Sequence, residues 1–138
     1  MRIECVSPFH VNLMWSDLFN DIVNAIKKTG GHIRANTIWN KLVVGDCNLL
    51  LFLEENQHDI KIAVVGQFEE WDGETVFHAN LVCKGTTKLW KENLPLLKDW
   101  AAGHGAKKII LAGQQDVYSR VFKEDNIKRV YTVYEMEI

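Results

Sequence analysis

The chain has 138 residues, of which 47% are hydrophobic and 25% are charged, and its formal net charge at pH 7 is −2. This length and composition are typical of one globular domain, which we expect to span residues 1–138. The negative charge disfavours a dedicated nucleic-acid-binding protein, because such proteins normally carry a basic excess. The longest apolar run, 49–53, is too short to cross a bilayer, so no membrane segment is expected.

The three cysteines, Cys5, Cys47 and Cys83, are widely spaced and form no C-x-x-C pair. This number and spacing disfavour both a disulfide framework and a zinc site, and they favour a reducing compartment. The five histidines show no metal-ligand spacing with carboxylates or cysteines. The N-terminal residues lack the basic-then-apolar pattern of a signal peptide. We therefore expect a cytoplasmic protein without a metal.

The first part of the chain predicts one strand and two helices. Residues 2–6 form a short strand candidate, which Ser7-Pro8 ends. Apolar residues recur at helical spacing from Val11 to Lys28, which predicts an amphipathic helix. A second, shorter helix is expected over 36–43, closed by Gly45.

Three strands are expected next, over 48–54, 60–68 and 75–83. The first is a nearly continuous apolar run, and the second alternates along its length. Asp72-Gly73 is a strong hairpin signal, because a type I′ turn needs positive φ and glycine tolerates it. These segments predict an antiparallel meander of three strands.

A helix, a strand, a helix and a strand complete the chain. The first helix begins near Thr86 or Thr87, either of whose hydroxyls can accept an unpaired helical N–H. Pro95 predicts a bend in that helix or a late start, and Gly103 stands where a left-handed cap is expected. The remaining elements are expected over 107–112 (strand), 116–125 (helix) and 131–138 (strand).

This order of elements resembles that of the GNAT superfamily of acyl-CoA N-acyltransferases, over the whole chain. The motif Leu96-Leu97-Lys98-Asp99-Trp100-Ala101-Ala102, followed by Gly105, Ile109-Ile110 and Gly113, is similar to small GNAT-like proteins of tailed phages. The resemblance implies an α/β (α+β) fold with a mixed sheet: an antiparallel meander, a parallel β-α-β unit and a final antiparallel strand. It also implies that 76–83 and 108–113 lie side by side in parallel and diverge to leave a slot for acetyl-CoA.

The resemblance further implies where the cofactor lies. In GNAT enzymes its pyrophosphate sits on backbone N–H groups at the start of the central helix, where the helix dipole favours anions. The family pattern there is R/Q-x-x-G-x-G/A, whereas this chain has a single glycine, so a weakened anion site and a plain capped helix start both fit. In the phage proteins an arginine stands at the position of Gln114. The residues assigned to cofactor binding are Val82, Cys83, Lys84, Gly85, Thr86, Thr87 and Gln114.

His78 is the first candidate for acid–base chemistry. It shares one face of the predicted strand with Asn80. The other face is expected to carry Phe77, Ala79 and Leu81. Histidine exchanges a proton near neutral pH, which suits a general base. A structural or solvated histidine is the alternative interpretation.

Glu69 and Glu70 are the other base candidates. Adjacent strand residues point to opposite faces, so only one of the two carboxylates could serve, and both also fit a role as solubilising charges. GNAT enzymes often protonate the departing thiolate with a tyrosine of the last helix. The resemblance puts Phe122 at that position. Tyr118, one helical turn earlier, becomes the candidate acid, with packing on the sheet as its alternative role.

Three functions are compatible with the sequence. The first is an acetyl-CoA-dependent N-acetyltransferase acting on an amine, or a degenerate relative with a weakened cofactor loop. The second is a catalytically inactive phage-type virion, assembly or host-interaction protein on the same fold. Its support includes the five tryptophans, with Trp71 at the hairpin tip, because aromatic residues are favoured at interfaces. The third is a regulator that binds acyl-CoA without turnover.

Overall fold

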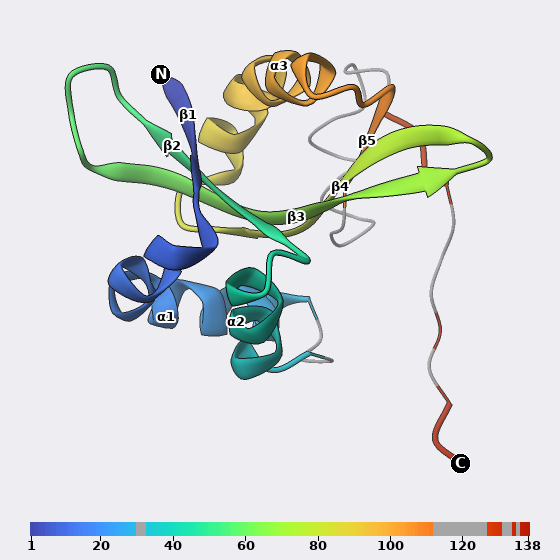
Figure 1. The fold of residues 1–138 in the computed structure, drawn as a ribbon, viewed down its shortest axis with the longest axis horizontal. Helices are drawn as coiled ribbons and strands as arrows, with labels where there is room; N and C mark the ends of the chain where they lie inside the picture. Colours follow the sequence, from blue (N-terminus) through green and yellow to red (C-terminus); the bar gives the residue numbers. More distant parts are fainter. Residues whose placement is uncertain (30–32, 112–126, 131–133, 135) are drawn as a thin grey trace.

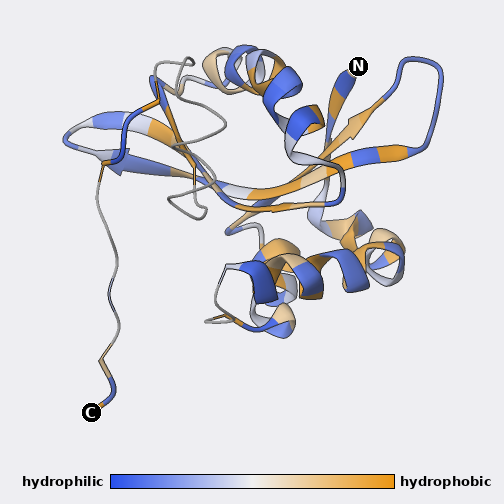
Figure 2. Ribbon diagram, turned by 180° about the vertical axis from the view of Figure 1, so that it is seen from behind, coloured by the Kyte–Doolittle hydropathy of each residue, from blue (hydrophilic) through white to orange (hydrophobic). Residues whose placement is uncertain are grey.

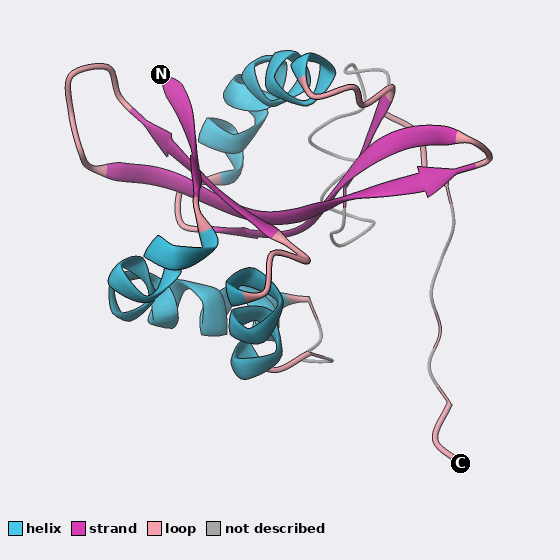
Figure 3. Ribbon diagram, in the orientation of Figure 1, coloured by secondary structure: helices cyan, strands magenta, loops and turns pink. Residues whose placement is uncertain are grey.

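The computed structural model describes residues 1–29, 33–111, 127–130, 134 and 136–138. Its elements are β1 (Arg2–Val6), the 3₁₀ turn η1 (Pro8–His10), α1 (Val11–Lys28), α2 (Ala35–Val43), β2 (Asn48–Leu53), β3 (Ile60–Trp71), β4 (Glu74–Cys83), α3 (Thr87–Gly103) and β5 (Lys108–Leu111). The sheet lies between α3 on one face and α1 and α2 on the other (Figures 1 and 3). This order confirms the predicted elements as far as β5.

The five strands form one sheet in the order β1-β2-β3-β4-β5. Neighbouring strands are antiparallel except β4 and β5, which run parallel from Val76 opposite Lys108 to Ala79 opposite Leu111. The predicted mixed sheet is therefore confirmed, and so is the parallel neighbourhood of 76–83 and 108–113 as far as Leu111. The divergence expected beyond that point involves 112 and 113, which lie outside the described residues.

The apolar core is divided by the sheet into two clusters. Leu49, Leu51 and Leu53 of β2 face α1 and α2, while Leu50 and Phe52 face α3. The continuous apolar run thus forms a strand that is covered on both faces. Figure 2 shows these central strands coloured as hydrophobic between helices of mixed hydropathy. Among the described residues, no helix is long and apolar enough to cross a membrane.

Local sequence signals account for most element ends. Asp72 and Gly73 have φ values of 51° and 79°, as a type I′ turn requires. Thr86 caps α3, since its side-chain oxygen accepts a hydrogen bond from Leu89 N at 3.1 Å. Pro95 lies inside α3, and the helix changes direction along its length (Figure 1).

The expected cap at Gly103 is wrong. Gly103 is the last residue of α3, and the left-handed conformation belongs to Gly105, with φ 91°. The helix runs on to Gly103, and the N–H groups of His104 and Gly105 bond the carbonyls of Ala101 and Ala102. The chain therefore turns two residues later than predicted.

A β-bulge changes which face the second half of β4 presents. Val65 pairs with Leu81 and Gly66 pairs with Ala79, so Asn80 is an extra residue in β4. Phe77 and Ala79 face α3 as predicted, but Leu81 packs with the α1/α2 cluster instead. The predicted shared face of Phe77, Ala79 and Leu81 is wrong because one inserted residue reverses the alternation that follows it.

The final helix and strand fall largely beyond the described part of the chain. The helix expected over 116–125 lies outside the described residues. Of the strand expected over 131–138, the described residues 134 and 136–138 are exposed and are assigned to no strand. The final antiparallel strand is therefore the one part of the predicted sheet that the described residues do not include.

Two of the three thiols are enclosed by the core. Cys47 and Cys83 are buried, while Cys5 is exposed. The Cys83 thiol donates to the carbonyl oxygen of Ala63 at 3.4 Å, and burial raises the pKa of Cys83 to about 12. Burial also raises the pKa of Cys47. Cys83 therefore behaves as an inert core thiol rather than a nucleophile.

Gly66 in β3 has no room for a side chain. A Cβ placed there would lie 2.8 Å from the carbonyl oxygen of His78 and closer still to the Phe77 ring. We expect Gly66→Ala to lower the free energy of unfolding by about 1–3 kcal/mol, the usual cost of overpacking. Gly103→Ala is the matched control, because nothing lies within 4 Å of its added Cβ. The free energy of unfolding of that variant, measured with urea, should rise by up to about 1 kcal/mol. Equal stability of the two variants would contradict the described packing.

A thiol titration tests the enclosed cysteines. At pH 8 the native protein should react rapidly at Cys5 alone, and in denaturant at all three cysteines. The folded state holds the Cys83 proton more tightly than the unfolded chain does. This contribution to stability is complete below the ordinary thiol pKa and is lost as pH rises toward the folded value. Modification of Cys83 in the native protein as fast as that of Cys5 would contradict this assignment.

Candidate active site

A hydrogen-bonded group of side chains lies on the α1/α2 face of the sheet, near the hairpin end of β3 and β4. Gln67, Glu69 and Trp71 alternate along β3, so the pleat puts them on one face. His78 Nδ1 lies 2.8 Å from Glu69 Oε2. Gln67 Nε2 donates to Glu69 Oε2 at 2.9 Å, and Trp71 Nε1 donates to Glu69 Oε1 at 3.1 Å. The Glu69 carboxylate is thus the centre of this group.

The Glu69 carboxylate is held in its charged form. Partial burial by itself raises the pKa of Glu69, but hydrogen bonds from Gln67, Trp71 and His78 outweigh it, so the pKa lies below its ordinary value. The side chains of His78 and Glu69 are 16% and 24% exposed. Both are mostly shielded, yet solvent or a small ligand can reach them. A carboxylate that is hydrogen-bonded to one ring nitrogen of a histidine can orient the ring, so that the other ring nitrogen accepts a proton.

The structure separates the two carboxylates that the sequence left as alternatives. Glu69 engages His78, whereas Glu70 is exposed on the opposite face of β3. Glu69 is therefore more than a solubilising charge. The hairpin turn is the sequence signal that could have predicted this contact. If Trp71 pairs with Glu74, the register puts Gln67 opposite His78. Glu69 then lies diagonally across from His78, within reach of a long side chain.

The loop assigned to the cofactor forms a tight turn between β4 and α3. Lys84 and Gly85 both have positive φ, at 62° and 85°. A Cβ on Gly85 would lie 2.7 Å from the Lys61 carbonyl oxygen, so only glycine fits there. Thr87 is the first residue of α3, where helical N–H groups lack intrahelical acceptors.

Of the other residues predicted for cofactor binding and acid catalysis, the structure describes Val82 and Cys83. Val82 packs on the α3 side of the sheet, and the Cys83 thiol points to the opposite side, into the core. Only the backbone of Cys83 is available at the α3 start. Gln114, Tyr118 and Phe122 lie outside the described residues.

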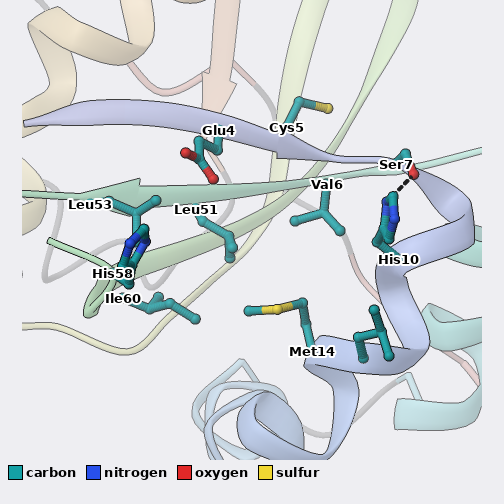
Figure 4. Close-up of a pocket in the computed structure, with 11 residues that line it drawn as sticks. Glu4, Cys5, Val6, Ser7, His10, Met14, Leu51, Leu53, His58 and Ile60 are labelled. Atoms are coloured by element: carbon teal, nitrogen blue, oxygen red, sulfur yellow. Dashed lines mark hydrogen bonds between the residues drawn. The ribbon is translucent and has the colours of Figure 1, made fainter. Parts of the chain in front are cut away.

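A separate hollow lies at the β1 edge of the sheet, at the far side from β5. It has a volume of about 620 Å³ and an apolar floor that includes Val6, Met14 and Leu51 (Figure 4). At its rim, Ser7 Oγ and His10 Nδ1 are 2.8 Å apart. The residues that line it include none of those predicted for catalysis or cofactor binding. The described residues also contain no group of three or more metal-ligating side chains.

No protein-family model matches the sequence, and no curated protein matches it either. Among solved structures, a probable acetyltransferase gives a TM-score of 0.68 at 14% identity, covering 100% of this chain and 98% of that one. A ribosomal-protein-alanine N-acetyltransferase from Brucella melitensis biovar Abortus 2308 gives 0.69 at 10% identity, with 100% of both chains covered. The aminoglycoside acetyltransferase meta-AAC0020 from an uncultured soil metagenomic sample, in complex with sisomicin, gives 0.66 at 11% identity, covering 99% and 96% of the two chains.

These likenesses extend over the whole chain at low sequence identity, so they concern the fold. They agree with the antiparallel meander followed by a parallel β4-α3-β5 unit. The chain therefore has the fold of GNAT-type acetyltransferases.

Proposed function

We propose that the protein transfers an acetyl group from acetyl-CoA to an amine. The observation that carries this proposal is the His78–Glu69 pair on β4 and β3, with Nδ1 and Oε2 2.8 Å apart. His78 lies within the described parallel pairing of β4 with β5, which runs from Val76 opposite Lys108 to Ala79 opposite Leu111. We infer that the imidazole stands near the thioester, because a GNAT fold admits acetyl-CoA between the strands that correspond to β4 and β5.

The chemistry needs a base because an amine is protonated at neutral pH. His78 Nε2 takes a proton from the ammonium group, and the freed nitrogen attacks the thioester carbonyl carbon. A C–N bond forms, the C–S bond breaks and coenzyme A leaves as a thiolate, while the positively charged nitrogen loses its second proton to water to give the amide. General-base help typically contributes about 10²–10⁴-fold, and positioning of the two substrates contributes the rest. Tyr118 is the proposed donor of a proton to the thiolate.

Acetyl-CoA would be held by 82–87 and Gln114. The positive end of the α3 dipole, the N–H groups of its first turn and Lys84 favour the pyrophosphate. An amine acceptor is supported by the aminoglycoside and ribosomal-protein-alanine acetyltransferases whose fold this chain shares.

The alternatives are separated by calorimetry with acetyl-CoA and with coenzyme A. Saturable binding with thioester consumption supports the enzyme. Binding without consumption, tried over a panel of amines, supports an acyl-CoA-binding regulator. Failure to bind either compound at millimolar concentration favours the catalytically inactive interaction protein.

Thr87→Glu tests the cofactor site. A carboxylate at the first helical residue should repel the pyrophosphate and weaken acetyl-CoA binding at least tenfold, while it stabilises the helix by about 0.3–1 kcal/mol through the dipole. Calorimetry gives the Kd, and Thr87→Ser is the matched control. Gly85→Glu is less informative, because any side chain at Gly85 meets the Lys61 carbonyl at 2.7 Å and would disturb the turn. Undiminished binding by Thr87→Glu would place the cofactor elsewhere.

His78→Gln tests the base. It should lower kcat by about 10²–10⁴-fold and leave the Kd of acetyl-CoA unchanged. Released coenzyme A is best measured by chromatography, because the exposed Cys5 would consume a thiol reagent. His58→Gln is the control, since His58 is exposed and lies at the β1 edge. A variant lacking His78 that keeps full kcat would rule out its role as base.

A further inference from the structure

We propose that Glu69 is the positioning residue for His78 and fixes its tautomer, so that the imidazole presents the lone pair of Nε2 to the incoming amine. The proposal rests on the proposed function for the part that the amine plays. The hydrogen-bond arrangement itself concerns this chain alone and can be measured without any substrate.

The first step concerns the proton between the two side chains. An ionised carboxylate has acceptors only, so the 2.8 Å contact with Glu69 Oε2 requires that Nδ1 of His78 carries the hydrogen. In the neutral ring the lone pair then belongs to Nε2. Neutral histidine in water prefers the opposite tautomer, with the hydrogen on Nε2. Glu69 therefore selects the form that can accept a proton at Nε2.

The second step concerns the carboxylate, which is fixed by donors on both oxygens. Oε2 accepts from His78 and Gln67, and Oε1 accepts from Trp71. All three donors are N–H groups, so an acceptor-only group satisfies them together. A protonated carboxyl or an amide would instead turn a donor toward at least one of them. The arrangement thus specifies a carboxylate at this position.

The third step extends the network to Cys47, which precedes β2. Its thiol donates to Gln67 Oε1 at 3.3 Å, which leaves the amide NH₂ of Gln67 directed at Glu69. The hydrogen bonds run in one direction from Cys47 through Gln67 to the carboxylate. Burial keeps the pKa of Cys47 raised, so the thiol stays a donor. The site is held by two strands of the sheet and by the residue that precedes β2, which gives the imidazole a defined orientation.

The experiment is ¹⁵N NMR of the histidine rings at alkaline pH, where neutral tautomers are distinguished by their nitrogen shifts. The wild-type protein should show His78 with its hydrogen on Nδ1. Glu69→Ala should move His78 mainly to the Nε2–H form, and Glu69→Gln, of nearly the same shape, should shift it in the same direction. Glu70→Ala is the matched control, because this neighbouring carboxylate is exposed on the other face and should leave the tautomer unchanged.

The kinetic part of the test uses the same variants. Glu69→Ala should lower kcat about ten- to hundredfold, the loss seen when the partners that orient metal-bound histidines are removed, with the Kd of acetyl-CoA unchanged. A wild-type His78 with its hydrogen on Nε2, or a tautomer that survives both Glu69 substitutions, would overturn the proposal. If the tautomer shifts as expected but the wild-type protein consumes no thioester, the positioning role of Glu69 holds and the proposed acetyl transfer fails.

Discussion

The pairing of β3 with β4 is the constraint on which the rest of the structure depends. A two-residue turn at Asp72-Gly73 joins the strands and aligns Trp71 with Glu74, and this register holds from the turn to the bulge at Asn80. That register sets Glu69 diagonally beside His78 on the face toward α1 and α2. Because side chains alternate with a period of two, a slip of one residue would move the whole set of one strand to the other face.

β4 also joins the two halves of the proposed site. One edge of the strand pairs with β3 and the other with β5, and its end leads through the turn at Gly85 into the start of α3. β4 and the turn that follows it pack closely against β3 at two glycines. The Phe77 ring covers Gly66, and Gly85 packs against the Lys61 carbonyl, both positions where a Cβ would collide. The imidazole and the helix start therefore stand on one continuous segment, from His78 to Thr87.

Most elements follow from local patterns. The apolar stripe of α1 predicted its bounds from Val11 to Lys28, and the Asp-Gly pair predicted the hairpin. One expectation failed because its outcome depends on a neighbouring strand. The bulge at Asn80 arises from the fit of β4 against β3 and moves Leu81 to the other face. Of the site, His78 was predicted from its residue type, while its carboxylate partner required the strand register.

The amino-acid sequence by itself determined the order and kind of the elements from β1 to β5, because helical periodicity, strand alternation and turn residues act over short stretches of chain. Only the tertiary structure decided that Cys47, Gln67, Glu69, Trp71 and His78 form one hydrogen-bonded network. These residues come from three separate segments. Their contact depends on strand register and on how the chain before β2 approaches β3, and neither can be deduced from any one segment.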